Sequence, residues 1–182
     1  MSRCFVLSTG RSGTLTWAKA CEHLDSHTVG HESHAGRITG RLDYDDDHIE
    51  IDNRLAWFTG LLEERYGDEP VYCHLTRDPE LVARSYARRF HVTGGLAAAF
   101  TSGIIHQPLP GSDTGRLDAM RLMVATVTAN ISMFLRDKTH VVTVDIAAPH
   151  SGFDAMVGML GATGDIDAAH RQLEVVTNAS RR

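Results

Sequence analysis

The sequence predicts an α/β fold, a three-layer α/β/α domain built around a central parallel sheet. Short apolar runs typical of buried strands alternate along the chain with segments of helical periodicity. The first apolar run begins almost at the N-terminus and ends at a glycine-rich loop that opens a helix. A second polar loop also lies between an apolar run and a helix, and ligands of parallel sheets bind at such strand ends.

Length and composition favour one soluble, cytoplasmic domain spanning residues 1–182. The chain is 42% hydrophobic, an ordinary globular value, and its net charge of -5 gives no general attraction for nucleic acid or anionic membranes. Three cysteines without C-x-x-C spacing indicate reduced thiols. No apolar run is long enough for a signal segment or a membrane span. We therefore expect no nucleic-acid or membrane partner, and we leave the oligomeric state open.

The expected elements follow from periodicity and from turn signals. In the first part we expect strands at residues 4–7 and 27–31, a helix from 13 to about 24, a polar segment at 35–50 and a helix at 51–66. A strand at 71–75 then leads into a helix that Asp78 caps and that extends to residue 90. Residues 93–115 form a partly ordered lid or acceptor loop. A long helix at 116–137, a strand at 140–144 and helices at 153–160 and 168–176 complete the chain.

A glycine-rich loop follows the first predicted strand. Successive backbone N–H groups at a helix N-terminus bind anions, and glycines allow the tight turn and close approach that a phosphate requires. An arginine adds a fixed charge and forked donors that suit phosphate or sulfate oxygens. The sequence therefore predicts an anion-binding loop made of Gly10, Arg11, Ser12, Gly13 and Thr14.

This loop differs at two positions from the nucleotide-kinase loop G-x-x-x-x-G-K-[ST]. Ser8 stands where that pattern has its first glycine, and Thr14 directly follows Gly13 where the pattern has lysine. The cation lies inside the loop instead, at Arg11. An ordinary Gly/Ser turn is the alternative interpretation of this loop when it is taken by itself.

A second candidate anion site lies where the third predicted strand ends. Arg77 follows that strand, and Ser85 lies eight residues later on the next helix. An arginine at a strand end and a serine on the following helix can converge on one dianionic phosphate. A capped helix start with a solvated arginine is the alternative. Two such loops in this order, each after a parallel strand, favour the functional interpretation.

Together the two motifs resemble those of sulfotransferases that use 3′-phosphoadenosine 5′-phosphosulfate (PAPS). In that family a Lys or Arg precedes Ser-Gly-Thr, as Arg11 does here, and an Arg at a strand end is followed eight residues later by a Ser, as Arg77 is by Ser85. The resemblance covers mainly residues 4–34 and 71–90. It implies a P-loop-like α/β fold, with the first loop on the 5′-phosphosulfate and the second on the 3′-phosphate. The basic glycine-rich C-terminal segment of cytosolic sulfotransferases is missing here.

The resemblance also implies a general base near the end of the second predicted strand. Glu32 is the favoured candidate, and His31 and His34 are the alternatives. Arg11 would stabilise the transferred group. A surface carboxylate and structural histidines are the alternative interpretations. The implied reaction moves a sulfuryl group from PAPS to a hydroxyl or amine of a small-molecule acceptor and requires no metal.

Two other functions stay open at this point. A P-loop nucleotide or small-molecule kinase would use ATP or GTP with Mg²⁺, and the missing loop lysine argues against it. A non-catalytic nucleotide-binding protein would keep the donor site without needing the acidic or histidine candidates. The acidic residues 43–48 can be interpreted as a pocket for a cationic acceptor or a metal, but a solvated loop is the favoured interpretation.

Overall fold

The computed structural model describes residues 2–90, 92, 94–108 and 110–175. Within them, five parallel strands form one sheet in the order β2-β3-β1-β4-β5. The α/β prediction with a parallel sheet is therefore confirmed. The strands are β1 (Arg3–Leu7), β2 (Thr28–His31), β3 (His48–Ile51), β4 (Val71–Thr76) and β5 (Val141–Asp145).

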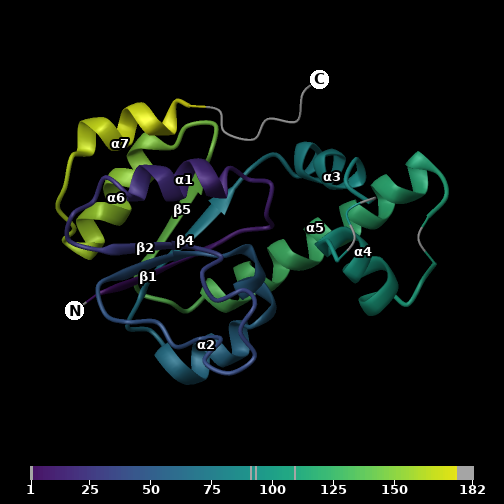
Figure 1. Ribbon diagram of the computed structural model, residues 1–182, viewed down its shortest axis with the longest axis horizontal. Coiled ribbons are helices and arrows are strands. Elements are labelled where there is room, and N and C mark those ends of the chain that lie inside the picture. Colours follow the sequence, from purple (N-terminus) through teal and green to yellow (C-terminus); the bar gives the residue numbers. More distant parts are fainter. Residues whose placement is uncertain (1, 91, 93, 109, 176–182) are drawn as a thin grey trace.

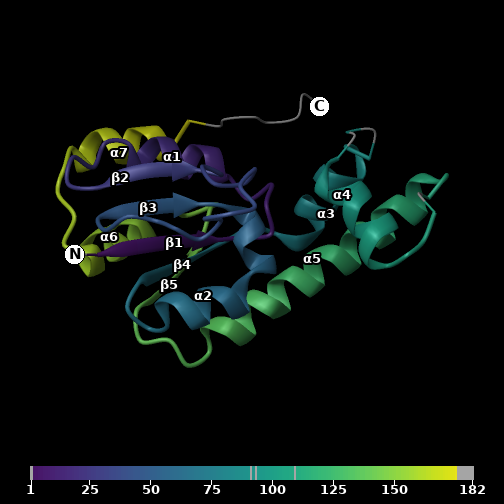
Figure 2. The ribbon, with the colours of Figure 1, turned by 60° about the horizontal axis from the view of Figure 1, so that its bottom comes forward.

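Helices cover both faces of the sheet and give the molecule three layers (Figures 1 and 2). The helices α1, α6 and α7 pack on one face, and α2, α3 and α5 belong to the core on the other face. The helices are α1 (Thr14–Cys21), α2 (Thr59–Tyr66), α3 (Pro79–Ala87), α4 (Leu96–Ala99), α5 (Asp113–Leu135), α6 (His150–Leu160) and α7 (Ile166–Leu173). A 3-10 helix at Asn53–Trp57 and a π-helix at Phe100–Ile104 supplement them.

The central strand β1 explains why a continuous apolar run identifies a strand here. Phe5 and Leu7 pack into the core beneath α2 and α5, whereas Cys4 and Val6 pack into the core beneath α1 and α6. All four side chains are buried because helices cover both faces of the sheet. The prediction of a strand at residues 4–7 is confirmed.

The connections place both candidate loops at the same edge of the sheet. The chain leaves β1 for α1 on one face, and it leaves the neighbouring strand β4 for α3 on the other face. Loops that turn to opposite faces of a parallel sheet open a crevice at the carboxyl ends of the strands, where ligands bind. The first loop (residues 8–14) and the second loop (residues 76–79) flank this crevice.

The strand β3 was not predicted, and the helix expected from residue 51 is wrong at its start. Ile51 ends β3, which lies between β2 and β1. Glu50 is buried in the middle of this four-residue strand, so its polar side chain interrupts the apolar run that marked the other strands. The helix α2 begins only at Thr59, after the 3-10 helix that the Asp52 side chain caps.

Other boundaries differ by smaller amounts. The long helix α5 begins at Asp113 rather than at residue 116, because the Ser112 hydroxyl accepts a hydrogen bond from the Gly115 N–H and caps its first turn. The segment expected to be a partly ordered lid contains α4 and the π-helix, while its residues 93 and 109 lie outside the described residues. The end of the last predicted helix, residue 176, lies outside them too. Among the described helices none is both long and apolar enough to cross a membrane.

Candidate functional site

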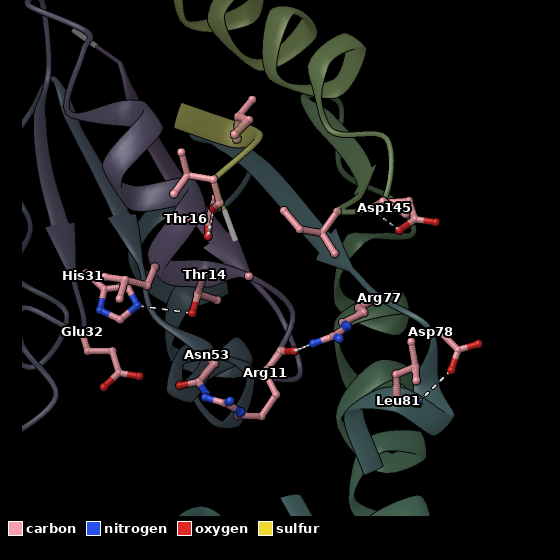
Figure 3. Close-up of a pocket in the computed structure, with 16 residues that line it drawn as sticks. Arg11, Thr14, Thr16, His31, Glu32, Asn53, Arg77, Asp78, Leu81 and Asp145 are labelled. Carbon is pink, nitrogen blue, oxygen red and sulfur yellow. Dashed lines mark hydrogen bonds between the residues drawn. The ribbon is translucent and has the colours of Figure 1, made fainter. Parts of the chain in front are cut away.

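A cavity of ≈ 550 Å³ opens at the carboxyl ends of the strands (Figure 3). The loop after β1, the end of β2 and the residues that follow β3, β4 and β5 all contribute to its lining. Of the residues predicted from the sequence, Arg11, Gly13, Thr14, His31, Glu32 and Arg77 line it. Gly10, Ser12 and Ser85 do not line it. Gly10 and Ser12 flank Arg11 in the first loop, and Ser85 accepts a hydrogen bond from Arg11.

The first loop has an unusual backbone conformation. Gly10, Arg11 and Gly13 have positive φ values of 75°, 56° and 84°. Glycine enters this region without strain, whereas it is uncommon for a residue such as Arg11. Gly13 precedes α1 and has no side chain, so within the described residues the first N–H groups of this helix have no N-cap side-chain acceptor. A side chain at Gly10 would also collide with its neighbours, because a Cβ there would lie 2.2 Å from Asn53 Nδ2 and Tyr86 Oη. One N–H of the loop is already used, because Gly10 N donates to Ser8 Oγ at 3.1 Å. The N–H groups at the start of α1 are therefore the ones that suit an anionic ligand.

Two hydroxyls of the first loop have different surroundings. Ser12 is fully buried, and its Oγ has no hydrogen-bond partner among the described residues. A buried unpaired hydroxyl is costly and is typical of a site that a water or an ion completes. Thr14 lines the cavity, and its Oγ1 lies 3.3 Å from His31 Nε2.

Hydrogen bonds join the two loops directly. Arg77 Nη1 donates to the Arg11 carbonyl oxygen at 2.9 Å, and Arg11 Nε donates to Ser85 Oγ at 3.0 Å. Figure 3 shows Arg77 pointing across the cavity edge toward the Arg11 backbone. The sequence had assigned Arg11 to the first loop and Ser85 to the second. In the structure the two side chains are in contact, so the two sites are adjacent.

Positive charge accumulates around this contact. Burial lowers the pKa of the Arg11 guanidinium, and the charges of Arg89, Arg77 and Arg88 lower it further, whereas Tyr86 acts in the opposite direction. None of Arg77, Arg88 and Arg89 forms an ion pair with a carboxylate in the part of the chain that the structure describes. In a protein of net charge -5, such a local excess of cations favours an anionic ligand.

The candidate bases differ in their surroundings. His31 and Glu32 both line the cavity, and Glu32 Oε2 forms an ion pair with Arg54 Nη1 at 2.6 Å. His34 instead stacks on Tyr44, with ring centroids 4.4 Å apart and an interplanar angle of 8°. Burial lowers the pKa of His34. Because His34 is not part of the cavity lining, the structure brings only His31 and Glu32 to the site.

Sequence reasoning gave no role to Asn53 or Tyr86. Asn53 lines the cavity, and its Nδ2 donates to Tyr86 Oη at 3.5 Å. Tyr86 Oη donates to the Thr9 carbonyl oxygen at 3.0 Å, and burial raises the pKa of Tyr86 to about 12. Tyr86 therefore supports the first loop from α3. The available signal for Asn53 was its place just after a strand, but that strand had not been recognised.

The acidic residues 43–48 lie away from the cavity. Asp46 pairs with Arg3, and Asp43 Oδ1 lies 2.7 Å from Arg65 Nη2. Neither aspartate lines the cavity, and both are exposed. No group of three or more His, Cys, Asp or Glu side chains within the described ranges is arranged to hold a metal ion.

No protein-family model matches the chain, and no curated protein matches it either.

Proposed function

We propose that the protein is a sulfotransferase with a P-loop-like fold that uses PAPS as its sulfuryl donor. The observation that carries this proposal is the pair of hydrogen bonds from Arg77 to the Arg11 carbonyl and from Arg11 to Ser85. They join the two candidate anion-binding sites, each with its own arginine, at the ends of the adjacent strands β1 and β4. A nucleotide with phosphates on both its 3′ and 5′ positions offers one anionic group to each loop.

The residues present suit such a donor. The start of α1, which has no side-chain cap at Gly13, and the unpaired Ser12 hydroxyl would suit the 5′-phosphosulfate. Arg77 and Ser85 favour the 3′-phosphate, by charge and by hydrogen bonding. Arg11 belongs to the first loop and donates to Ser85 of α3, one of the two residues assigned to the 3′-phosphate. The sequence predicted that Arg11 acts on the 5′-phosphosulfate. We propose that its charge acts on the 3′-phosphate as well.

The bound donor would supply an activated sulfuryl group, and the protein would position and stabilise charge. Sulfuryl transfer resembles phosphoryl transfer, in which positioning and electrostatic stabilisation do most of the work. His31 and Glu32 lie on the side of the cavity opposite Arg77 (Figure 3). A hydroxyl or amine of a small acceptor on that side would give its proton to Glu32 or His31. Arg11 would stabilise the charge that develops on the transferred group.

The three cysteines support a cytoplasmic setting for this activity. Cys4, Cys21 and Cys73 are all buried and free. Burial raises the pKa of each thiol, which keeps these side chains protonated and unreactive. Buried, reduced thiols are typical of proteins in reducing compartments.

A thermal-shift titration with adenosine 3′,5′-bisphosphate, ATP plus Mg²⁺ and GTP plus Mg²⁺ tests the proposal. A ligand at 100 times its Kd raises the free energy of unfolding by ~2.7 kcal/mol. We expect the bisphosphate to stabilise the protein at the lowest concentration, without Mg²⁺. A preference for ATP or GTP with Mg²⁺ would identify a kinase instead.

A second assay separates an enzyme from a non-catalytic binding protein. We expect release of adenosine 3′,5′-bisphosphate from PAPS when phenol or amine probes are supplied, and a large loss of this release in Glu32→Gln or His31→Gln. Tight binding of the bisphosphate without turnover, and with no effect of either substitution, would indicate a binding protein.

A further inference from the structure

A buried carboxylate lies behind the two candidate bases. Glu50 is fully buried in β3, and in the sheet register it pairs with Gly30 of the edge strand β2. The next residue of β2 is His31, and Glu32 follows it. Glu50 does not line the cavity, so any effect of this residue on the site must pass through its neighbours.

Glu50 holds the chain immediately after Glu32. Ser33 N donates to Glu50 Oε1 at 2.9 Å, and Ser33 Oγ donates to Glu50 Oε2 at 2.5 Å. His48 Nε2 lies 3.1 Å from Glu50 Oε2. Gly30 leaves room for the carboxylate, because a Cβ at this position would lie 2.3 Å from Glu50 Oε2. The turn after β2 is thus attached to β3 by a charged group.

The turn has a geometric consequence for the candidate bases. Successive side chains of a regular strand point to opposite faces, so His31 and Glu32 would face different sides if β2 simply continued. Glu32 has a φ of 53°, a left-handed conformation that is uncommon for residues other than glycine and persists only where neighbours enforce it. With this conformation both side chains line the same cavity.

Two sets of hydrogen bonds enforce the conformation of Glu32. On one side its own N–H donates to the Ile51 carbonyl oxygen at 3.0 Å. On the other side Glu50 binds both donors of Ser33. Glu32 is therefore fixed between two attachments to the same strand, β3.

We propose that Glu50 is a positioning residue that, through Ser33, holds His31 and Glu32 toward the cavity. Its importance for sulfuryl transfer rests on the proposed function, whereas its effect on the conformation of the turn does not. The hydrogen bonds of the Glu50 carboxylate within the described residues go to Ser33 and His48 and to neither loop, so donor binding is expected to be independent of it.

The surroundings of Glu50 favour its charged form. Burial alone raises the pKa of Glu50, but the hydrogen bonds from His48 and Ser33 outweigh burial, and the net pKa lies below the ordinary value. The Tyr44 ring stacks on the rings of His34 and His48, with centroids 4.4 Å and 5.6 Å away. A charged acceptor forms stronger hydrogen bonds than a neutral one, which suits a group that must hold a strained turn.

Amide hydrogen exchange of the Glu32 N–H tests the positioning role without any assumption about function. Ser33→Ala removes the hydroxyl bond to Glu50, and Gly30→Ala displaces the carboxylate from the other side. In both variants we expect the Glu32 amide to exchange about tenfold faster or more, with the Val6 amide of the central strand unchanged. Ser33→Thr keeps the hydroxyl and is expected to retain the wild-type rate.

Thr139 provides a matched control. Its N–H and hydroxyl donate to the two carboxylate oxygens of Asp68, at 2.7 Å and 2.5 Å, which repeats the Ser33–Glu50 arrangement at the loop before β5. We expect Thr139→Ala to leave the Glu32 exchange rate unchanged. An unchanged Glu32 rate in Ser33→Ala and Gly30→Ala, or an equal acceleration in Thr139→Ala, would overturn the positioning role.

Turnover separates this inference from the proposed function. With PAPS and 4-nitrophenol as the acceptor probe, we expect Ser33→Ala to lower kcat about 10-fold to 100-fold and to change the Kd of adenosine 3′,5′-bisphosphate less than about twofold. Equal losses in kcat and in bisphosphate affinity would contradict a role confined to the candidate bases. If the wild-type protein binds no bisphosphate, the proposed function fails, while the exchange experiment still decides whether Glu50 positions the turn.

Discussion

At the scale of single residues, Arg77 connects the geometry of the site to its selectivity. Its side chain is exposed, and one of its N–H groups donates to the Arg11 carbonyl. A guanidinium has five N–H donors, so this one hydrogen bond still allows Arg77 to bind a phosphate. Ser85, the second residue assigned to that phosphate, is buried and accepts a hydrogen bond from Arg11. Replacement of Arg77 therefore tests the 3′ assignment most directly.

We expect Arg77→Ala to weaken the binding of adenosine 3′,5′-bisphosphate much more than the binding of adenosine 5′-phosphate. Loss of a charge-assisted hydrogen bond costs about 1.5–3 kcal/mol, or about 10-fold to 100-fold in Kd. Only the bisphosphate has the group that Arg77 is proposed to contact, so titration calorimetry with both ligands gives the answer. Arg84→Ala is the control, because Arg84 lies on α3 and pairs with Glu80. Equal losses of affinity for the two ligands would show that Arg77 does not bind the 3′-phosphate.

The residues of the site differ in how far the sequence could predict them. Arg11 and Arg77 were found because an arginine next to a strand end suggests an anion by its chemistry alone. The contact between Arg11 and Ser85 was not predicted, because it depends on β1 and β4 being neighbours and on the path of a long side chain. Asn53 was missed because it follows β3, a strand whose apolar pattern Glu50 interrupts.

At the scale of elements, the sequence predicted helix and strand boundaries best where a single side chain determines the boundary. Asp78 Oδ1 accepts a hydrogen bond from the Leu81 N–H at 2.8 Å, as expected for the residue that caps α3. Boundaries that depend on tertiary contacts were harder to predict. The edge strand β2 ends at a turn that Glu50 holds, and the π-helix at Phe100–Ile104 lies in a segment whose composition suggested a loop.

The helix α6 offers a test of packing at this scale. Gly152 lies against β5, and a Cβ at this position would lie 2.6 Å from Val144 Cγ2. We expect Gly152→Ala to lower the free energy of unfolding by about 1–3 kcal/mol, because the added methyl group overpacks the contact between α6 and the sheet. Urea unfolding followed by circular dichroism measures the change.

Gly158 is the matched control on the same helix. It is exposed, and a Cβ there would meet nothing within 4 Å. Gly158→Ala is expected to raise the free energy of unfolding by about 0.5–1 kcal/mol, since alanine favours a helix interior over glycine. A stabilising effect of both substitutions would mean that α6 does not pack closely against β5.

At the scale of the whole molecule, charge is distributed unevenly. The protein carries a net charge of -5, yet Arg77, Arg88 and Arg89 are all close enough to Arg11 to lower its pKa. A protein tolerates such repulsion where a ligand relieves it, because strained or unfavourable groups gather at functional sites. Binding of an anion at this cluster should therefore stabilise the entire fold and not only the two loops.

Histidines that are buried or half-buried in the fold give the molecule a stability that depends on pH. Burial lowers the pKa of His74 in β4 from its ordinary value of 6.5, and it also lowers the pKa of His34 and His27. As the pH falls through 6.5, the unfolded chain takes up protons at these positions before the folded chain does. The free energy of unfolding is therefore expected to decrease from about pH 7 to pH 5, above the range in which ordinary carboxylates titrate.

Replacement of His74 isolates its share of this dependence. His74 is buried and burial is the cause of its lowered pKa, whereas His34 and His27 are more accessible. We expect urea midpoints of His74→Gln to vary less between pH 7 and pH 5 than those of the wild-type protein, because the substituted side chain cannot take up a proton when the chain unfolds. His23→Gln on the exposed surface serves as the control, and its urea midpoint should change with pH as that of the wild-type protein does. If the urea midpoint depended on pH equally in His74→Gln and in the wild-type protein, His74 would take up its proton equally in the folded and unfolded states. That outcome would contradict the effect of burial on its pKa.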